Sequence, residues 1–281
     1  MPIGPLAVFG GGTMGRAIVA RCVDRGVIEA ACTFVAETGL AKHAEFHDFG
    51  VRPFATATEA AAAAESLGRA VWLLAVKPQS FKGLATELRA GGFSPDGRII
   101  ISIMAGLTAQ TVAEELGCAS RGGVVRTMPN LGATTGQGVA AIADNTGAGE
   151  PALRAAERLM GCLGPCVERI DESLLNAFTA VAGSGPAYVF FLAEAMIASA
   201  TDLGLPPSMA DRVVRATISG AAALLADSES SPASLRSSVT SKGGTTQAAI
   251  EAMERDSVGS AIRRAIAAAA ARAAELASDR K

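Results

Sequence analysis

This sequence contains few histidines and few cysteines, and it has almost no excess of either positive or negative charge. Of its 281 residues only 2 are His and 5 are Cys, and 25 Lys and Arg stand against 27 Asp and Glu, for a formal net charge of -2. Nucleic-acid-binding domains carry clustered basic residues, and no block of like charges occurs here. We therefore expect no nucleic-acid partner.

The few cysteines argue against a zinc site. Only Cys162 and Cys166 lie close in sequence, and no second pair of ligands completes a site. We expect no metal. We interpret the scattered cysteines as small core residues of a reduced, cytoplasmic protein; they are Cys22, Cys32, Cys118, Cys162 and Cys166.

A leader peptide and a membrane span are also not expected. The segment "PLAVFGGG" passes at once from apolar residues into glycines. The one long uncharged stretch, Leu174 to Ala193, is interrupted by Asn176 and by "GSGP" at Gly183 to Pro186. We interpret it as a buried pair of helices joined at Gly185-Pro186, and we expect no membrane partner.

The first part of the chain alternates short apolar runs with helical patterns. The runs are "LAVFG", "CTFVAE", "AVWLLAVKP", "RIIISIMAG", "GGVVRTMPN" and "GVAAIA". This βα alternation predicts an α/β, Rossmann-like domain with a mainly parallel sheet over residues 1–170. After "CVERIDE" the strand-like runs stop, which predicts an all-helical domain over residues 171–281.

The helical part is apolar on most faces, as in "AVAGSGPAYVFFLAEAMIASATDLGL". Helices that are apolar all round must be buried, and a bundle of this size cannot bury such a surface alone. We expect a homo-oligomer with a large subunit interface. The alternative is packing against the first domain.

A glycine turn between the first strand and the first helix matches the dinucleotide fingerprint, GxGxxG. Gly10 makes the turn, Gly12 admits the pyrophosphate, and Gly15 lets the helix approach the strand. The alternative is a glycine-rich turn without a ligand. The expected cofactor contacts here are Gly10, Gly12, Thr13, Met14 and Gly15.

An acidic residue ends the second predicted strand. Glu37 can accept hydrogen bonds from the ribose hydroxyls, which favours NADH over NADPH; the alternative is a solvated carboxylate. Further cofactor contacts are expected at later strand ends, where ligands of open α/β sheets bind. Lys77 is alternatively a solvated side chain. These contacts are Ala75, Val76, Lys77, Pro78, Ala105, Gly106 and Asn130.

The sequence offers no strong base for the nicotinamide end. His43 and His47 follow the second predicted strand, near the adenosine end, and no lysine occurs between Pro151 and Ser241. This counts against a hydroxyacid dehydrogenase with a lysine base. Reduction of an imine fits, because a protonated C=N is electrophilic and needs positioning more than proton transfer.

Hydroxyls crowd around two glycines in "SVTSKGGTTQAAI", residues 238–250, at the head of a predicted helix. One Ser or Thr suffices for an N-cap. The stretch is either a polar loop with a cap or a site for a small anion such as a carboxylate.

These motifs together resemble the pyrroline-5-carboxylate reductase family over nearly the whole chain. The resemblance lies in "FGGGTMG", "AVKPQ", "RTMPN", "DESLLNAFTAVAGSGPAY" and, most specifically, "SLRSSVTSKGGTTQAAIEAME". It implies a Rossmann-like domain, a helical dimerisation and substrate-binding domain, and dimers that often assemble into decamers. The implied reaction is reduction of 1-pyrroline-5-carboxylate to L-proline by NAD(P)H, the last step of proline biosynthesis.

The resemblance also implies roles for the hydroxyl-rich segment. Thr246 is the catalytic residue that hydrogen-bonds the ring nitrogen of the substrate. The carboxylate cradle comprises Ser241, Gly243, Gly244, Thr245 and Thr246. Lys242 stands where many members have proline. The rival interpretations are a related imine or β-hydroxyacid reductase and a non-catalytic nucleotide- or pyridoxal-phosphate-binding protein.

Overall fold

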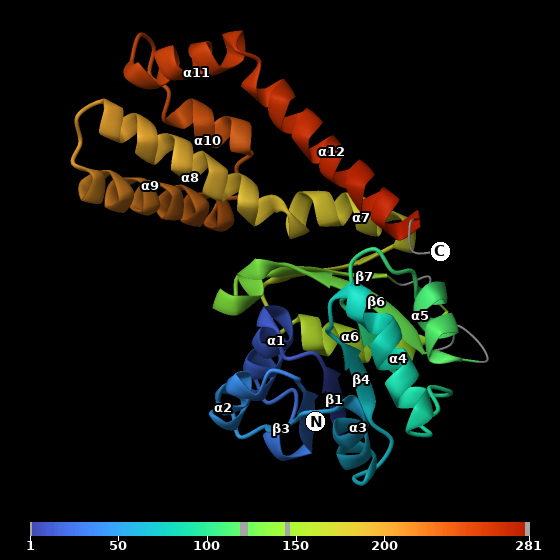
Figure 1. Cartoon of the computed structure of the whole chain (residues 1–281). Helices are drawn as coiled ribbons and strands as arrows, with labels where there is room; N and C mark the ends of the chain where they lie inside the picture. Colours follow the sequence, from blue (N-terminus) through green and yellow to red (C-terminus); the bar gives the residue numbers. More distant parts are fainter. Residues whose placement is uncertain (1, 119–122, 144–146, 279–281) are drawn as a thin grey trace. The chain divides into compact units, whose positions relative to one another are not determined.

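The computed structural model describes residues 2–118, 123–143 and 147–278. The chain divides into two compact units (Figure 1). The first holds the residues up to Ser184 together with those from Ala269, and the second is Gly185–Ala268. We therefore describe each unit by itself.

Among the described residues, the first unit contains an eight-stranded sheet in the order β3-β2-β1-β4-β5-β6-β7-β8. Every neighbouring pair is parallel except β6 with β7. The strands are β1 Leu6–Phe9, β2 Thr33–Ala36, β3 Arg52–Phe54, β4 Val71–Leu74, β5 Ile100–Ser102, β6 Val124–Pro129, β7 Val139–Ala143 and β8 Cys166–Ile170. This arrangement confirms the predicted mainly parallel sheet.

Local signals fix several of the helices that connect these strands. Thr56 and Glu59 form a capping box at the start of α3, and α5 ends at Gly117, which adopts the left-handed conformation that glycine tolerates. The helices are α1 Thr13–Asp24, α2 His43–His47, α3 Ala57–Glu65, α4 Phe81–Ala90, α5 Ala109–Leu116 and α6 Glu150–Met160.

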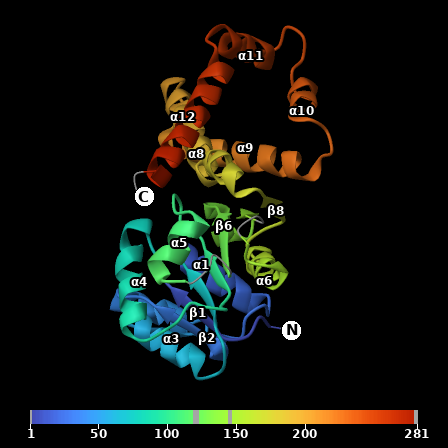
Figure 2. The same cartoon turned by 90° about the vertical axis from the view of Figure 1, so that its right-hand side faces the viewer.

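The strands send alternate side chains into two separate cores. Leu6 and Val8 pack with α1 and α6, whereas Ala7 and Phe9 pack with α3, α4 and α5, which lie together on one side of the sheet in Figure 2. Burial on both faces explains why the sequence shows continuous apolar runs instead of alternation. The α/β fold class is confirmed.

Two details of the sheet were not predicted. β3 was not predicted, because a three-residue strand that contains Pro53 gives almost no pattern. β7 runs antiparallel to β6, which the runs alone do not indicate. Gly122, the first residue of the predicted "GGVVRTMPN" run, lies outside the described residues.

The second unit is helical in its described residues. It consists of α8 Gly185–Asp202, α9 Pro207–Asp227, α10 Pro232–Ser238, α11 Thr245–Arg255 and the first half of α12 Val258–Ser278. α8 and α9 lie side by side. Pro207 and Pro232 begin their helices, where a missing backbone N–H costs nothing.

The predicted joint at Gly185-Pro186 is wrong in one respect. α7 Leu175–Phe178 continues through a π-helical turn, Thr179–Gly183, and α8 begins directly after Ser184. Pro186 falls in the first turn of α8, where it does not break the helix. The two helices therefore form an almost unbroken helical segment.

The expected burial of this segment is not found within the chain. The helical stretch Glu172–Asp202 is long and apolar enough to cross a membrane. Its most apolar window has a mean hydropathy of 1.4, and only 6% of that window is buried. Length and composition do not distinguish a membrane span from a helix that a second subunit covers.

Candidate active site

Where β1 turns into α1, neighbouring backbone atoms leave no room for a Cβ at Gly10 or Gly15. A Cβ on Gly15 would lie 2.1 Å from the carbonyl oxygen of Gly10. A Cβ on Gly10, whose φ is +111°, would lie 2.6 Å from the backbone of Ala75. The glycines thus bring α1 against β1 and β1 against the end of β4.

Gly12 differs from these two, because a Cβ built on it meets no atom within 4 Å. It is the N-cap of α1, no side chain caps the helix, and the first turn holds no acidic residue. A helix start with free amide donors and an open approach is suited to an anion such as pyrophosphate. The residues present therefore fit a dinucleotide. Thr13 is exposed and Met14 is half-buried beside this turn.

Glu37 stands beside this turn at the end of β2 and is only 9% exposed. Its Oε1 accepts a hydrogen bond from the amide of Gly39 at 2.8 Å and lies 3.4 Å from Nζ of Lys42. His43 contacts the carbonyl oxygen of Glu37 at 2.6 Å. Glu37 is thus held in place and paired with a cation, and it is not the solvated carboxylate of the alternative interpretation.

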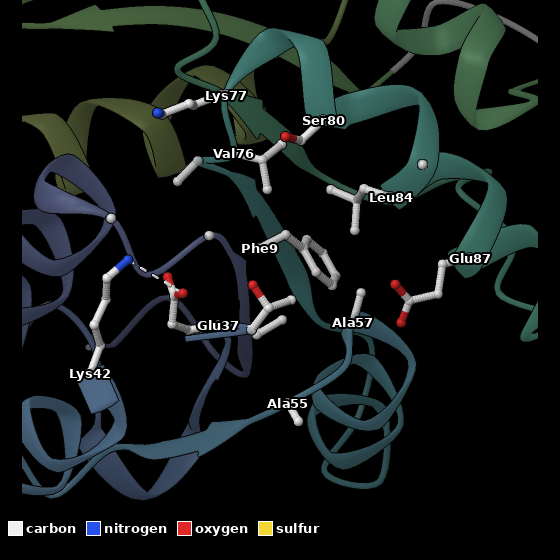
Figure 3. Close-up of a pocket in the computed structure, with 16 residues that line it drawn as sticks. Phe9, Glu37, Lys42, Ala55, Ala57, Val76, Lys77, Ser80, Leu84 and Glu87 are labelled. Carbon is white, nitrogen blue, oxygen red and sulfur yellow. Dashed lines mark ion pairs between the residues drawn. The ribbon is translucent and has the colours of Figure 1, made fainter. Parts of the chain in front are cut away.

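A cavity of about 460 Å³ joins the glycine turn to Glu37 (Figure 3). It brings together six predicted cofactor residues: Gly10, Gly12, Glu37, Ala75, Val76 and Lys77. Lys77 is exposed at its rim. Pro78 begins a 3-10 turn, Pro78–Ser80, that leads into α4.

The sequence interpretation missed the far wall of this cavity. Four residues at near-helical spacing, Ser80, Gly83, Leu84 and Glu87, line it from α4 and the turn before it. That spacing after "AVKPQ" was the available signal, but an amphipathic helix produces the same pattern when it only packs on the sheet.

Of the contacts predicted at the later strand ends, those that follow β5 and β6 lie outside the lining of this cavity. Gly106, with φ +70°, is buried and follows the exposed Ala105 after β5. The amide of Asn130 is occupied by the fold: its Nδ2 donates to the carbonyl of Ala182 at 3.1 Å and its Oδ1 accepts from the amide of Val139 at 3.1 Å. A role of Asn130 toward a nicotinamide remains a prediction.

An ion pair fastens β6 to the segment that follows β8. Nη1 of Arg126 donates to Oε1 of Glu172 at 3.0 Å, and the same oxygen accepts from the amide of Ala109, the first residue of α5, at 2.9 Å. Burial lowers the pKa of Arg126, and the bond to Glu172 opposes that shift. The pair thus ties β6, α5 and the start of the helical segment together.

Two of the five cysteines, all of them free, are core residues as predicted. Cys22 of α1 donates to the carbonyl of Leu159 of α6 at 3.4 Å. A hydrogen bond with Cys162 and burial raise the pKa of Cys22, and the same bond lowers the pKa of Cys162. The other three are half-buried. Cys118 packs against the core, whereas the core interpretation is wrong for Cys32 and Cys166.

The hydroxyl-rich segment of the second unit forms the loop before α11. Gly244 is the N-cap of α11, and no side chain caps the helix although several hydroxyls surround it. The amide of Gly243, whose φ is +73°, donates to Oε1 of Gln247 at 2.7 Å, and the amide of Gly244 donates to the carbonyl of Ser241 at 3.1 Å.

The first amides of α11 are left as donors. Among the residues that the structure describes, none accepts a hydrogen bond from the amides of Thr245 and Thr246 or from the hydroxyl of Thr246. Thr246 is half-buried and Ser241 and Thr245 are exposed. A helix start in this condition can bind a small anion such as a carboxylate.

The doubly covered sheet, its glycine turn and the Glu37 cavity define the class of dinucleotide-binding proteins. Comparison with known families agrees. Residues 5–106 match the family described as NADP oxidoreductase coenzyme F420-dependent, and residues 172–276 match the one described as pyrroline-5-carboxylate reductase dimerisation.

Individual relatives extend this match over the full chain. The chain is 35% identical to the pyrroline-5-carboxylate reductase of Synechocystis over 96% of its own length and 97% of the relative's. It is 34% identical to that of Pseudomonas aeruginosa, covering 97% and 96%. The solved structure of the Coxiella burnetii enzyme superposes with a TM-score of 0.85 at 32% identity, covering 98% of each chain. The chain belongs to the pyrroline-5-carboxylate reductase family.

Proposed function

We propose that the chain reduces 1-pyrroline-5-carboxylate to L-proline with NAD(P)H. The observation that carries this proposal is near-complete coverage of relatives that are named for this reaction, at about one third identity. The residues agree with it, since the glycine turn fits a dinucleotide and the start of α11 presents uncapped amide donors.

The reaction requires the chain to position the substrate more than to transfer a proton. When bound, the reduced nicotinamide supplies a hydride, which adds to the imine carbon while the nitrogen carries the proton. The amides of Thr245 and Thr246 hold the carboxylate, because the helix start is positively polarised. Ser241, Gly243 and Gly244 shape the loop that presents these amides.

Thr246 is proposed as the residue that orients the ring nitrogen through its hydroxyl. Replacement by Ala removes one oriented hydrogen bond, which costs about 1 to 3 kcal/mol if the partner stays buried. We expect kcat/KM for the imine to fall about 10-fold to 100-fold in Thr246→Ala, while the Kd of the coenzyme stays near that of the parent. Unchanged kcat/KM would remove Thr246 from the mechanism. Thr240→Ala is the control, because the hydroxyl of Thr240 already donates to the carbonyl of Arg236 at 2.7 Å.

The chain uses both coenzymes with a preference for NADH. Glu37 accepts the ribose hydroxyls and repels a 2′-phosphate, whereas Lys42, which also lines the cavity, offsets part of that repulsion and offers the phosphate a cation. Two opposed charges 3.4 Å apart thus make the preference moderate.

Comparison of kcat/KM for NADH and NADPH at one ionic strength tests this assignment. Glu37→Ser should shift the ratio toward NADPH, and Lys42→Met should shift it toward NADH, each about tenfold, since that corresponds to about 1.4 kcal/mol. A parent that prefers NADPH tenfold or more would contradict the role of Glu37. A Lys42→Met variant that affects both coenzymes equally would contradict the role of Lys42.

The active form is proposed to be a homodimer that assembles further into decamers, located in the cytoplasm. The matched dimerisation family and the exposed apolar helices support the dimer. The five free cysteines are consistent with a reducing compartment. We expect sedimentation at micromolar concentration to show no active species of 28.3 kDa, the mass of one chain.

The reaction itself is tested with purified protein, pyrroline-5-carboxylate and either coenzyme. Loss of absorbance at the reduced nicotinamide band should match the L-proline formed, one for one. A β-hydroxyacid reductase would oxidise the coenzyme only with its own substrate, and a nucleotide- or pyridoxal-phosphate-binding protein would bind without turnover. Coenzyme binding without oxidation would therefore exclude the proposed reaction.

A further inference from the structure

The cavity beside the glycine turn extends past Glu37 to a second carboxylate. Phe9, Ala57 and Leu84, all buried, form apolar walls between the two acidic residues. Glu87 of α4 lies at the opposite end of the cavity from the pair of Glu37 and Lys42 (Figure 3).

The carboxylate of Glu87 is anchored by one oxygen only. Its Oε1 accepts from the amide of Thr58 at 3.0 Å and from the hydroxyl of Thr58 at 3.3 Å. No other described residue donates a hydrogen bond to the carboxylate of Glu87, and its Oε2 has no donor among them. An ionised carboxylate is an acceptor with two oxygens, so one half-buried oxygen on the cavity wall is left for a donor.

The position of this oxygen matches one group of a dinucleotide. With pyrophosphate at the start of α1 and ribose at Glu37, the base is directed into the part of the cavity between Phe9, Leu84 and Ala57. Adenine is a flat ring with an amino group, N6, as its exocyclic donor. We propose that Oε2 of Glu87 accepts a hydrogen bond from N6 and selects adenine among purine bases.

This assignment rests on the proposed use of a nicotinamide dinucleotide and makes a separate prediction. Hypoxanthine carries a carbonyl oxygen where adenine carries N6, and an acceptor opposite a carboxylate is repelled. We expect the chain to bind NAD⁺ about tenfold more tightly than nicotinamide hypoxanthine dinucleotide, as for one hydrogen bond to a charged group.

The variant Glu87→Gln should reverse the preference. Both donors of Thr58 face one oxygen, so the amide oxygen of Gln stays on Thr58 and its NH₂ group faces the cavity. That NH₂ opposes N6 of adenine and suits the carbonyl of hypoxanthine. If Glu87 only anchored α3, Glu87→Gln would weaken the binding of both dinucleotides equally. Thr58→Val is the matched control, because it removes one anchoring donor and should leave the ratio unchanged.

The readout is the pair of Kd values from calorimetry without substrate, with thermal unfolding to verify the fold. A tenfold preference for adenine in the parent, lost or reversed in Glu87→Gln, supports the role of Glu87. Equal Kd values in the parent would overturn it without any variant. That result would not affect the proposed reaction. A failure to bind either dinucleotide would contradict both the role of Glu87 and the proposed reaction.

Discussion

Phe9, Trp72 and Leu73 are fully buried between two layers of helices in the sheet unit, whereas Phe191 is 73% and Leu203 is 87% exposed in the helical unit. Among the described hydrophobic residues of Gly185–Ala268, only Ala210 and Val214 are buried. One unit completes its core within the chain, and the other leaves most of its apolar side chains exposed, as expected for the proposed homodimer.

This difference separates two sources of stability. Burial in the sheet unit does not depend on other molecules, so its contribution is independent of protein concentration. In the proposed homodimer, burial in the helical unit requires assembly and follows mass action. Mutations in the two units should therefore differ in how their effects respond to concentration.

The largest expected effect is loss of assembly. Phe191→Glu places a charge on the exposed face of α8, and burial of an unpaired charge in an interface is strongly unfavourable. We expect the subunit Kd to rise at least about 100-fold in sedimentation equilibrium, with loss of activity at low concentration. Leu67→Glu, at a comparably exposed apolar position after α3, should leave the assembly unchanged. Equal subunit Kd values for Phe191→Glu and Leu67→Glu would contradict the difference between the two units.

The next effect concerns the glycine turn. Gly12→Ala should weaken coenzyme binding about 100-fold, a loss of about 2.7 kcal/mol, at an unchanged melting temperature, because its Cβ meets no protein atom and occupies the approach to the helix start. Gly15→Ala should lower the melting temperature as well, since its Cβ lies 2.1 Å from the Gly10 oxygen. Calorimetry and thermal unfolding measure both. Tight binding in Gly12→Ala would show that the dinucleotide avoids this turn.

A smaller effect tests the self-contained core of the sheet unit. Glu172→Gln leaves Arg126 buried without its counterion, which should cost about 2 kcal/mol, less than a fully buried pair because Glu172 is partly solvated. Urea unfolding should give this loss at every protein concentration. Glu45→Gln, in the exposed pair with Arg16, should cost less than about 1 kcal/mol. If the loss of unfolding free energy in Glu172→Gln depended on protein concentration, the ion pair would act through subunit assembly and not through the core of the sheet unit.

The smallest effect is a pH dependence at the surface. Two hydrogen bonds from Arg169, each 3.0 Å long, lower the pKa of Glu150 below its ordinary value of 4.5. A carboxyl with a lower pKa in the folded state stabilises it above the unfolded pKa, and this contribution is lost as pH falls through the folded value. The melting temperature of the parent should exceed that of Glu150→Gln at neutral pH, and the difference should disappear in acid. A constant difference would contradict the ion-pair explanation.

The sequence predicted those parts of the fold that depend on local patterns. The spacing of Gly10, Gly12 and Gly15 indicated the turn. Close backbone neighbours leave no room for a Cβ at Gly10 and Gly15, whereas Gly12 leaves the approach to the start of α1 open. The buried strands were found as apolar runs. The π-helical turn at Thr179–Gly183 was not, because a segment that is apolar on all faces carries no helical period to interrupt.

The site was less predictable because its contacts are tertiary. The pairing of Lys42 with Glu37 depends on the 3-10 turn Leu40–Lys42, which the sequence does not indicate. Glu87 reaches the cavity because α4 packs beside the start of α3, and no spacing in the sequence connects it with Thr58. Roles of Thr246 and Asn130 toward bound molecules remain predictions.

The most direct test of the central claim compares two substrates. The claim is that this chain reduces a cyclic imine and selects it by a carboxylate held at the start of α11. We predict that kcat/KM for pyrroline-5-carboxylate exceeds that for 1-pyrroline, the same ring without the carboxylate, by at least about 100-fold, because the unpaired amides then lose their anion. Equal values would contradict the carboxylate site, and no oxidation of NADH or NADPH with pyrroline-5-carboxylate would contradict the proposed reaction.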